Sequence, residues 1–209
     1  RHGEYRESVD IDFLVSDLSG YRGLRQLLTG PDGTLALAAT RTPPWRPVRD
    51  IRADQYGLRT ALDAGGERPI KFEIILAGRI GFDIPAPEHS ICGVATLTRS
   101  DMVASKLLAN ADRWADDGVF SRDLIDLAML RPERGIWKAG MAKAEAAYGN
   151  AVRQAVTKAM QQLRNRPDRL ARCMRAMRMD IPKAVLWQRM RNIEKLAAGT
   201  TTSSPDTRR

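Results

Sequence analysis

Cysteine is scarce in this sequence: among 209 residues only Cys92 and Cys173 occur, and neither belongs to a CxxC pair. This spacing excludes a disulfide framework and a cysteine-based zinc site, so both are expected to be buried free thiols. Histidine is equally rare, and His2 and His89 do not form a cluster with other metal ligands, so both are expected to be surface residues. A histidine metal centre and a nucleophilic triad are therefore not predicted.

Long hydrophobic runs are also missing. Charged residues or proline interrupt every apolar stretch before it reaches the ~20 residues that cross a bilayer. No basic leader with an apolar segment and a small-residue cleavage site follows the first residue. A soluble, cytoplasmic protein without a membrane partner is expected. Because the first residue is Arg1 and not methionine, we also expect the chain to be truncated at its amino terminus.

Positive charge, in contrast, is in excess: 34 Lys and Arg residues oppose 25 Asp and Glu residues, a formal net charge of +9. Much of it lies between Arg153 and Lys195, where acidic residues are few. Such a surface favours a polyanionic partner such as nucleic acid. Within it, Arg169, Arg172 and Arg175 recur every third residue and are either contacts for RNA phosphates or a solvated helix face.

Two segments alternate between apolar and polar residues, as a half-buried strand does. The first spans residues 9–15, with Val9, Ile11, Phe13 and Val15 predicted to face inward, and the second spans residues 70–76. Between them we expect a helix over 18–28 capped by Ser16 or Asp17. Weaker patterns predict short β segments at 35–39, 48–53 and 56–62, followed by a hairpin turn at 64–67.

From about residue 99 onward the sequence has helical periodicity. It predicts helices at 102–113, at 124–130 before Pro132, along one long segment 137–163, at 168–179 and at 183–197. The fold class is therefore α/β (α+β): a small mixed-sheet domain at 1–98, followed by a helical domain at 99–198. Residues 199–209 are small and polar and are expected to be a disordered tail.

The acidic residues of the two strands are candidates for metal chemistry. Asp10 and Asp12 occupy positions i and i+2 of one strand and therefore share a face, which suits bridging of divalent cations. Two-metal phosphoryl or nucleotidyl transfer needs a third acid from a neighbouring strand, and Glu73 lies on the polar side of the second strand. The alternative is that these acids only line the solvent face of a sheet.

A longer set of residues favours the metal site. It consists of Arg6-Glu7-Ser8-Val9-Asp10-Ile11-Asp12-Phe13, then Lys106-Leu107-Leu108-Ala109 and Arg113, then Arg122-Asp123-Leu124-Ile125-Asp126-Leu127. This ordered set resembles the AbiEii/AbiGii toxin family of the polymerase-β-like nucleotidyltransferase superfamily. The resemblance spans roughly residues 1–130, and the joint pattern is more specific than any single piece.

The resemblance implies a role for each of these polar residues. Asp10, Asp12 and Glu73 would be the catalytic acids that hold Mg²⁺. The nucleoside triphosphate substrate would be bound by Ser8, Lys106, Arg113, Asp123 and Asp126. Family members also carry a Gly-Gly or Gly-Ser turn before the Asp-x-Asp strand, whose amides bind phosphate, and this sequence begins too late to include it.

The polar residues of the helical half can also be interpreted without reference to the family. Lys106 is a flexible point charge suited to triphosphate oxygens, and Arg113 falls on nearly the same helix face two turns later, although both could belong to a solvated basic face. Asp123 and Asp126 are i,i+3 neighbours whose like charges require a cation. Arg122 can supply that cation without any catalysis.

The function implied is that of a toxin of a toxin-antitoxin or abortive-infection phage-defence system. It would transfer a nucleotidyl group from an NTP, with tRNA as the expected acceptor and an antitoxin protein as a further partner. One alternative is a small-molecule nucleotidyltransferase of the antibiotic-modifying kind, which would not need so basic a helical half. The other is a catalytically inactive fragment that binds nucleic acid.

Overall fold

The structure is a computed structural model that describes residues 5, 6, 10–38, 40, 42–91 and 93–199. Contacts divide the chain into two compact units. Residues 10–81 form the sheet unit, and residues 5, 6 and 82–199 form the helical unit. The sequence predicts a domain boundary near residue 98, whereas the compact sheet unit ends at Gly81. Residues 82–98 belong with the helices, because Asp83 contacts both Asp101 and Lys143.

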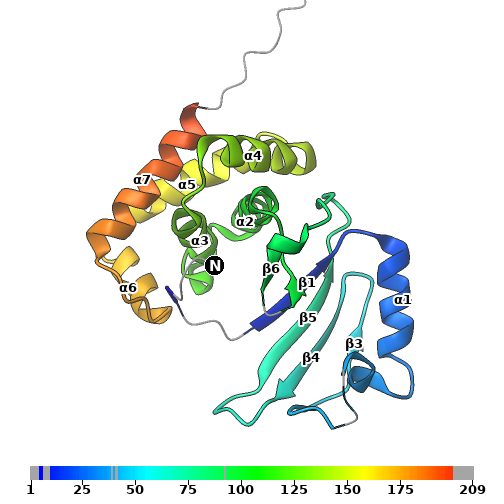
Figure 1. The fold of residues 1–209 in the computed structure, drawn as a ribbon. Coiled ribbons are helices and arrows are strands. Elements are labelled where there is room, and N and C mark those ends of the chain that lie inside the picture. Colours follow the sequence, from blue (N-terminus) through cyan, green and yellow to red (C-terminus); the bar gives the residue numbers. More distant parts are fainter. Residues whose placement is uncertain (1–4, 7–9, 39, 41, 92, 200–209) are drawn as a thin grey trace, which may run out of the picture. The chain divides into compact units, whose positions relative to one another are not determined.

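A mixed sheet forms the sheet unit, with strand order β1-β5-β4-β2 and β3 paired to β4 (Figure 1). Strand β1 pairs in parallel with β5, and β5 pairs antiparallel with β4 across the predicted hairpin. The elements are β1 (Asp10–Val15), α1 (Leu18–Leu28), the 3-10 helix η1 (Gly33–Leu37), β2 (Arg46–Pro47), β3 (Arg52–Ala53), β4 (Gly57–Asp63) and β5 (Ile70–Leu76). The predicted strand at 35–39 is wrong, since residues 33–37 form η1.

Helix α1 begins as predicted, with Asp17 as its N-cap: the carboxylate accepts hydrogen bonds from the amides of Ser19 and Gly20. The helix packs on the apolar face of the sheet. Their shared core contains Tyr21 and Leu28 of α1 together with Leu58, Phe72 and Ile74 of the sheet.

The inward face predicted for the first strand is only partly buried. Val15 packs against the core, but Ile11 is 41% and Phe13 is 36% exposed. The reason is that β1 is an edge strand of the sheet. The predicted position of Val9 lies outside the described residues.

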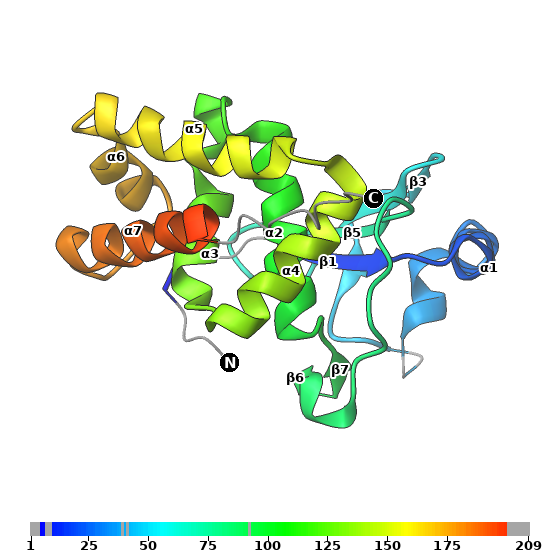
Figure 2. The same cartoon turned by 90° about the horizontal axis from the view of Figure 1, so that it is seen from above.

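Helices dominate the other unit (Figure 2). Helix α2 packs against α3, α4 and α5, and α3 packs against α7. The helices are α2 (Arg99–Arg113), α3 (Arg122–Leu130), α4 (Arg134–Tyr148), α5 (Ala151–Asn165), α6 (Arg169–Ala176) and α7 (Lys183–Gly199). Short elements precede or join them: η2 (Pro87–His89), β6 (Ser90–Ile91), β7 (Val94–Ala95) and η3 (Asp117–Val119).

The prediction of one long helix over 137–163 is wrong, because the helix is interrupted at Gly149, between α4 and α5. Gly149 has φ 62° and ψ −155°, a conformation that is essentially restricted to glycine. The apolar spacing predicted one helix because Trp137, Met141 and Ala144 of α4 are buried, as are Val152 and Ala155 of α5.

Two further sequence predictions concern the ends and the cysteines of the chain. Cys173 is buried, as expected, whereas Cys92 lies outside the described residues. The predicted tail after residue 199 also lies outside them. Within the described residues, no helix has the length and apolar character needed to cross a membrane.

Candidate active site

The three predicted catalytic acids lie on one face of the sheet. In the parallel pairing of β1 with β5, Asp10 is opposite Lys71 and Asp12 is opposite Glu73. Because side chains alternate along a strand, Asp10, Asp12 and Glu73 project from the same side, opposite the apolar face that α1 covers. The predicted adjacency of the two acidic strands is therefore confirmed.

Glu73 is surrounded by positive charge on this face. Its Oε1 lies 3.0 Å from Arg59 Nε, and its Oε2 lies 2.5 Å from Lys71 Nζ. Arg59 is the register partner of Glu73 on β4 and also binds Asp54 at 2.8 Å. Glu73 is 8% exposed, so these two cations are the neighbours that compensate the burial of its charge.

This arrangement fits a metal ion only in part. Two carboxylates at i and i+2 of a strand are suitable oxygen ligands for a divalent cation. Within the part of the chain that the structure describes, however, no three His, Cys, Asp or Glu side chains are grouped closely enough to hold one. As placed, Glu73 is bound to Arg59 and Lys71. The metal assignment of Asp10, Asp12 and Glu73 stays a prediction.

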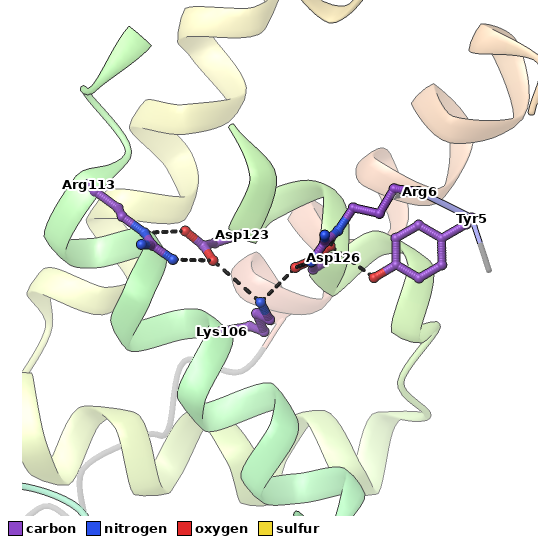
Figure 3. Close-up of polar contacts among 6 residues, drawn as sticks. All are labelled: Tyr5, Arg6, Lys106, Arg113, Asp123 and Asp126. Atoms are coloured by element: carbon purple, nitrogen blue, oxygen red, sulfur yellow. Dashed lines mark hydrogen bonds and ion pairs between the residues drawn. The ribbon is translucent and has the colours of Figure 1, made fainter. Parts of the chain in front are cut away.

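In the helical unit, α2 and α3 bring the other predicted residues together (Figure 3). Arg113 forms a two-point ion pair with Asp123: Nε lies 2.7 Å from Oδ2 and Nη2 lies 3.0 Å from Oδ1. Lys106 Nζ lies 2.6 Å from Asp126 Oδ2 and 3.6 Å from Asp123 Oδ1. Lys106 and Arg113 lie two turns apart on α2, and their long side chains converge on two acids that lie one turn apart on α3.

Asp126 has two further partners that the sequence did not suggest. Arg6 donates from Nε to Oδ1 at 2.8 Å and from Nη2 to Oδ2 at 3.1 Å, and Tyr5 Oη donates to Oδ1 at 2.9 Å. No local pattern predicts these contacts, because 120 residues separate Arg6 from Asp126. Arg122, the counter-charge suggested by the sequence, makes no ion pair within the described residues; Lys106, Arg113 and Arg6 compensate the acids instead.

Burial and neighbouring positive charges shift the pKa of Asp126 in opposite directions. Burial alone would raise the pKa of this carboxyl, but the hydrogen bonds from Arg6 and the charges of Lys106 and Arg6 outweigh it and hold the pKa below its ordinary value. The pKa of Tyr5 is raised by burial and by the neighbouring Asp126 charge, so the phenol stays protonated and donates a hydrogen bond to the carboxylate.

Lys106 is far more accessible than the two acids that it contacts. Its side chain is 31% exposed, whereas those of Asp123 and Asp126 are 2% exposed. Two buried carboxylates thus contact the ammonium group of a lysine whose side chain is partly exposed. Such a lysine can bind a phosphate oxygen while the acids keep its position fixed. The predicted contact of Ser8 with nucleotide lies outside the described residues.

The arginine repeat on α6 does not form one phosphate-binding face. Arg169 is 4% exposed and forms an ion pair with Asp117 at 2.5 Å. Arg172 and Arg175 are exposed. Arg169 is therefore a structural residue that joins α6 to η3.

Comparison with known protein families gives a match over most of the chain. A sequence model of a protein family, described as "Nucleotidyl transferase AbiEii toxin, Type IV TA system", matches residues 1–194. Comparisons with curated proteins and with solved structures give no match. The matched span contains both groups of residues described above, the acids of β1 and β5 and the cluster between α2 and α3.

Proposed function

This chain belongs to the AbiEii nucleotidyltransferase toxin family of type IV toxin-antitoxin systems, and from that premise we propose that it is a metal-dependent enzyme that transfers a nucleotidyl group from an NTP to tRNA. Membership implies a nucleotide substrate and an antitoxin counterpart. The metal requirement, the tRNA acceptor and a role in abortive phage defence are our proposals. Such a reaction takes place in the cytoplasm, where NTPs and tRNA are present.

The observation that carries the proposal is the cluster formed by Lys106, Arg113, Asp123 and Asp126, which we call the Lys106 cluster. An ammonium group that is partly exposed and is held by Asp123 and Asp126 forms a preorganised site for a phosphate. Preorganised charge of this kind stabilises the negative charge that develops on phosphate oxygens during transfer. Asp123 and Asp126 are therefore proposed to position Lys106 and Arg113, which is how they would contribute to nucleotide binding.

Asp10 and Asp12 are proposed to hold Mg²⁺. When bound there, the ion would supply charge neutralisation and activation of the acceptor hydroxyl. Their shared strand face suits this role, and Glu73 is the proposed third acid. In the structure Glu73 is bound by Arg59 and Lys71, so these two residues compete with any ion for its carboxylate.

The test is transfer of label from each of the four radiolabelled NTPs to tRNA in the presence of Mg²⁺. We expect Asp12→Ala to abolish incorporation and Lys106→Met to lower kcat by about 10²-fold or more, the usual effect of losing one transition-state donor. Asp32→Asn is the matched control, because Asp32 is an exposed acid of the same unit as Asp12 and makes no capping hydrogen bond. Unchanged incorporation in Lys106→Met would contradict the proposed phosphate site.

Two other functions give different results in the same assay. A small-molecule nucleotidyltransferase would label a low-molecular-weight hydroxyl compound and leave tRNA unlabelled. A nucleic-acid-binding protein without catalysis would bind tRNA in a salt-dependent manner and label neither acceptor with any NTP. The ion pairs of Glu73 are the observation that favours this last alternative, because they occupy a proposed metal ligand.

A further inference from the structure

Two adjoining pockets are lined by residues from the end of α3, the start of α4 and the second half of α7. Their volumes are about 230 and 290 Å³, and they share Asn192 and Leu196 as lining residues, so they form one continuous depression. We call it the α3–α7 groove. Each of the two pockets has a smaller volume than the roughly 300–1,000 Å³ of a typical small-molecule site.

Four basic residues line the α3–α7 groove: Arg131, Arg134, Arg189 and Lys195. In the part of the chain that the structure describes, no acidic residue lines either pocket. Beneath this basic lining, the first pocket also contacts Ala128 and Ile193, which are almost completely buried. A shallow depression with an apolar floor and a basic rim suits a chain of sugars and phosphates, because riboses cover the floor while phosphates meet the cations.

Ion pairing distinguishes these four residues from several other cations of the helical unit. Lys143, Arg153 and Arg164 each bind a carboxylate of a neighbouring element. Among the described residues, no ion pair involves any of the four groove cations. Arg189 donates one hydrogen bond, from Nη1 to Met129 Sδ at 3.0 Å, which leaves most of the five guanidinium donors available.

The start of α4 also borders the groove. Arg134 is the first residue of this 15-residue helix, and its N-cap, Glu133, makes no side-chain capping hydrogen bond. The partial positive charge of this helix N-terminus is offset by the carboxylate of Glu133, so Arg134 is the charge that this end contributes to the groove. Glu133 itself lies outside the lining of both pockets, and Glu194 of α7 is bound to Arg164.

Helix α3 connects the groove to the Lys106 cluster. It carries Asp126 near its middle, and Arg131 follows at its carboxyl end. With a rise of 1.5 Å per residue, five residues correspond to about 7.5 Å along the helix axis. The carboxyl end of α3, which borders the groove, thus lies within about two helical turns of Asp126 along the chain.

We propose that the α3–α7 groove binds the phosphate backbone of the acceptor RNA. This inference rests on the proposed function, because it assigns the acceptor's binding surface. The groove is distinct from the residues that contact the nucleotide. It is also distinct from α6, where the sequence first suggested RNA contacts.

The experiment compares two charge-matched double variants of the full chain. Arg134→Ala with Lys195→Ala removes two exposed groove cations, and Arg172→Ala with Arg175→Ala removes two exposed cations of α6. Binding of labelled tRNA is measured by fluorescence anisotropy from 50 to 300 mM salt. Circular dichroism confirms that both variants are folded.

We expect the groove variant to raise the Kd for tRNA about tenfold. The slope of log K against log salt should fall by about 2, because two phosphates are no longer neutralised by the protein. The α6 variant should change the Kd less than about twofold. In the transfer assay, the groove variant should raise KM for tRNA and leave KM for the NTP unchanged.

Equal effects in both variants would overturn the inference, because they would indicate binding through net charge alone. Unchanged tRNA binding combined with abolished binding of an acidic antitoxin protein would also overturn it, by identifying the groove as a protein interface. If the groove variant fails to bind tRNA but the wild-type chain labels no acceptor, the inference stands and the proposed transfer activity fails.

Discussion

Asp126 is a buried carboxylate with four donor contacts from three residues: Tyr5, Arg6 and Lys106. Burying a charge is unfavourable unless partners replace the water that it loses. Here the replacement is complete enough to hold the pKa of Asp126 below its ordinary value. The same contacts make Asp126 sensitive to substitution, since removing one member of a buried pair leaves the others uncompensated.

Asp126→Asn should therefore lower the free energy of unfolding by about 3–5 kcal/mol at pH 7. The folded-state pKa of Asp126 lies below the unfolded value near 3.9, so the carboxylate contributes stability above that pH. This contribution is lost as pH falls through the folded-state pKa. The difference in the free energy of unfolding between wild type and variant should accordingly shrink below about pH 4. Urea unfolding between pH 3 and pH 7 measures it.

Asp180→Asn provides the control for this titration, because Asp180 is an exposed acid outside the cluster. It should change stability by less than about 0.5 kcal/mol at any of these pH values. A difference between wild type and Asp126→Asn that stays constant down to pH 3 would show that the charge of Asp126 does not stabilise the fold.

At the scale of elements, the break between α4 and α5 depends on one backbone conformation. The apolar positions on either side of Gly149 continue with helical spacing, yet the two helices are separate. Gly149 accepts a φ and ψ that other residues rarely adopt, and its amide donates to the Glu145 carbonyl as the helix C-cap. The break thus redirects α5 against α2 and α7.

We predict that Gly149→Ala lowers the free energy of unfolding by about 1–3 kcal/mol, the cost of forcing a side chain into this conformation. The space around the position is open, so steric overlap adds nothing to this value. Denaturant unfolding measures it, with Gly135→Ala as the control, because Gly135 lies inside α4 with equally open surroundings. Alanine there should be neutral or stabilising. Equal effects at the two positions would contradict the proposed role of Gly149.

At the scale of the whole molecule, the two units have cores of different size. The sheet unit has a main buried cluster of Tyr21, Leu28, Leu58, Phe72 and Ile74. The helical unit buries many more large side chains, among them Trp137, Leu107, Leu124, Met160 and Leu186, each 0% exposed. Since hydrophobic stabilisation grows with buried apolar area, the helical unit should be the more stable of the two.

Native-state hydrogen exchange should reveal this difference. Amides of β4 and β5 are expected to exchange at least about tenfold faster than amides of α2 and α3, which corresponds to openings about 1.4 kcal/mol lower in free energy. Mass spectrometry of peptides from each unit measures the rates. Equal protection of all four elements would indicate that the two units unfold as one cooperative structure.

By itself the sequence determined the elements that depend on local patterns. Alternation identified β1 and β5, helical spacing and capping identified α1, α2 and α3, and the ordered motif residues identified the family. These features were readable because side-chain periodicity and capping are local properties of the chain.

Only the tertiary structure decided which charges meet. The acids of β1 and β5 share a face because those strands pair in parallel, and the contacts of Glu73 with Arg59 and Lys71 follow from that sheet order. Arg6 and Tyr5 bind Asp126 across some 120 residues, and the groove cations gather where α3, α4 and α7 meet. Such contacts depend on how elements pack, and spacing along the chain does not specify the partner of each charge.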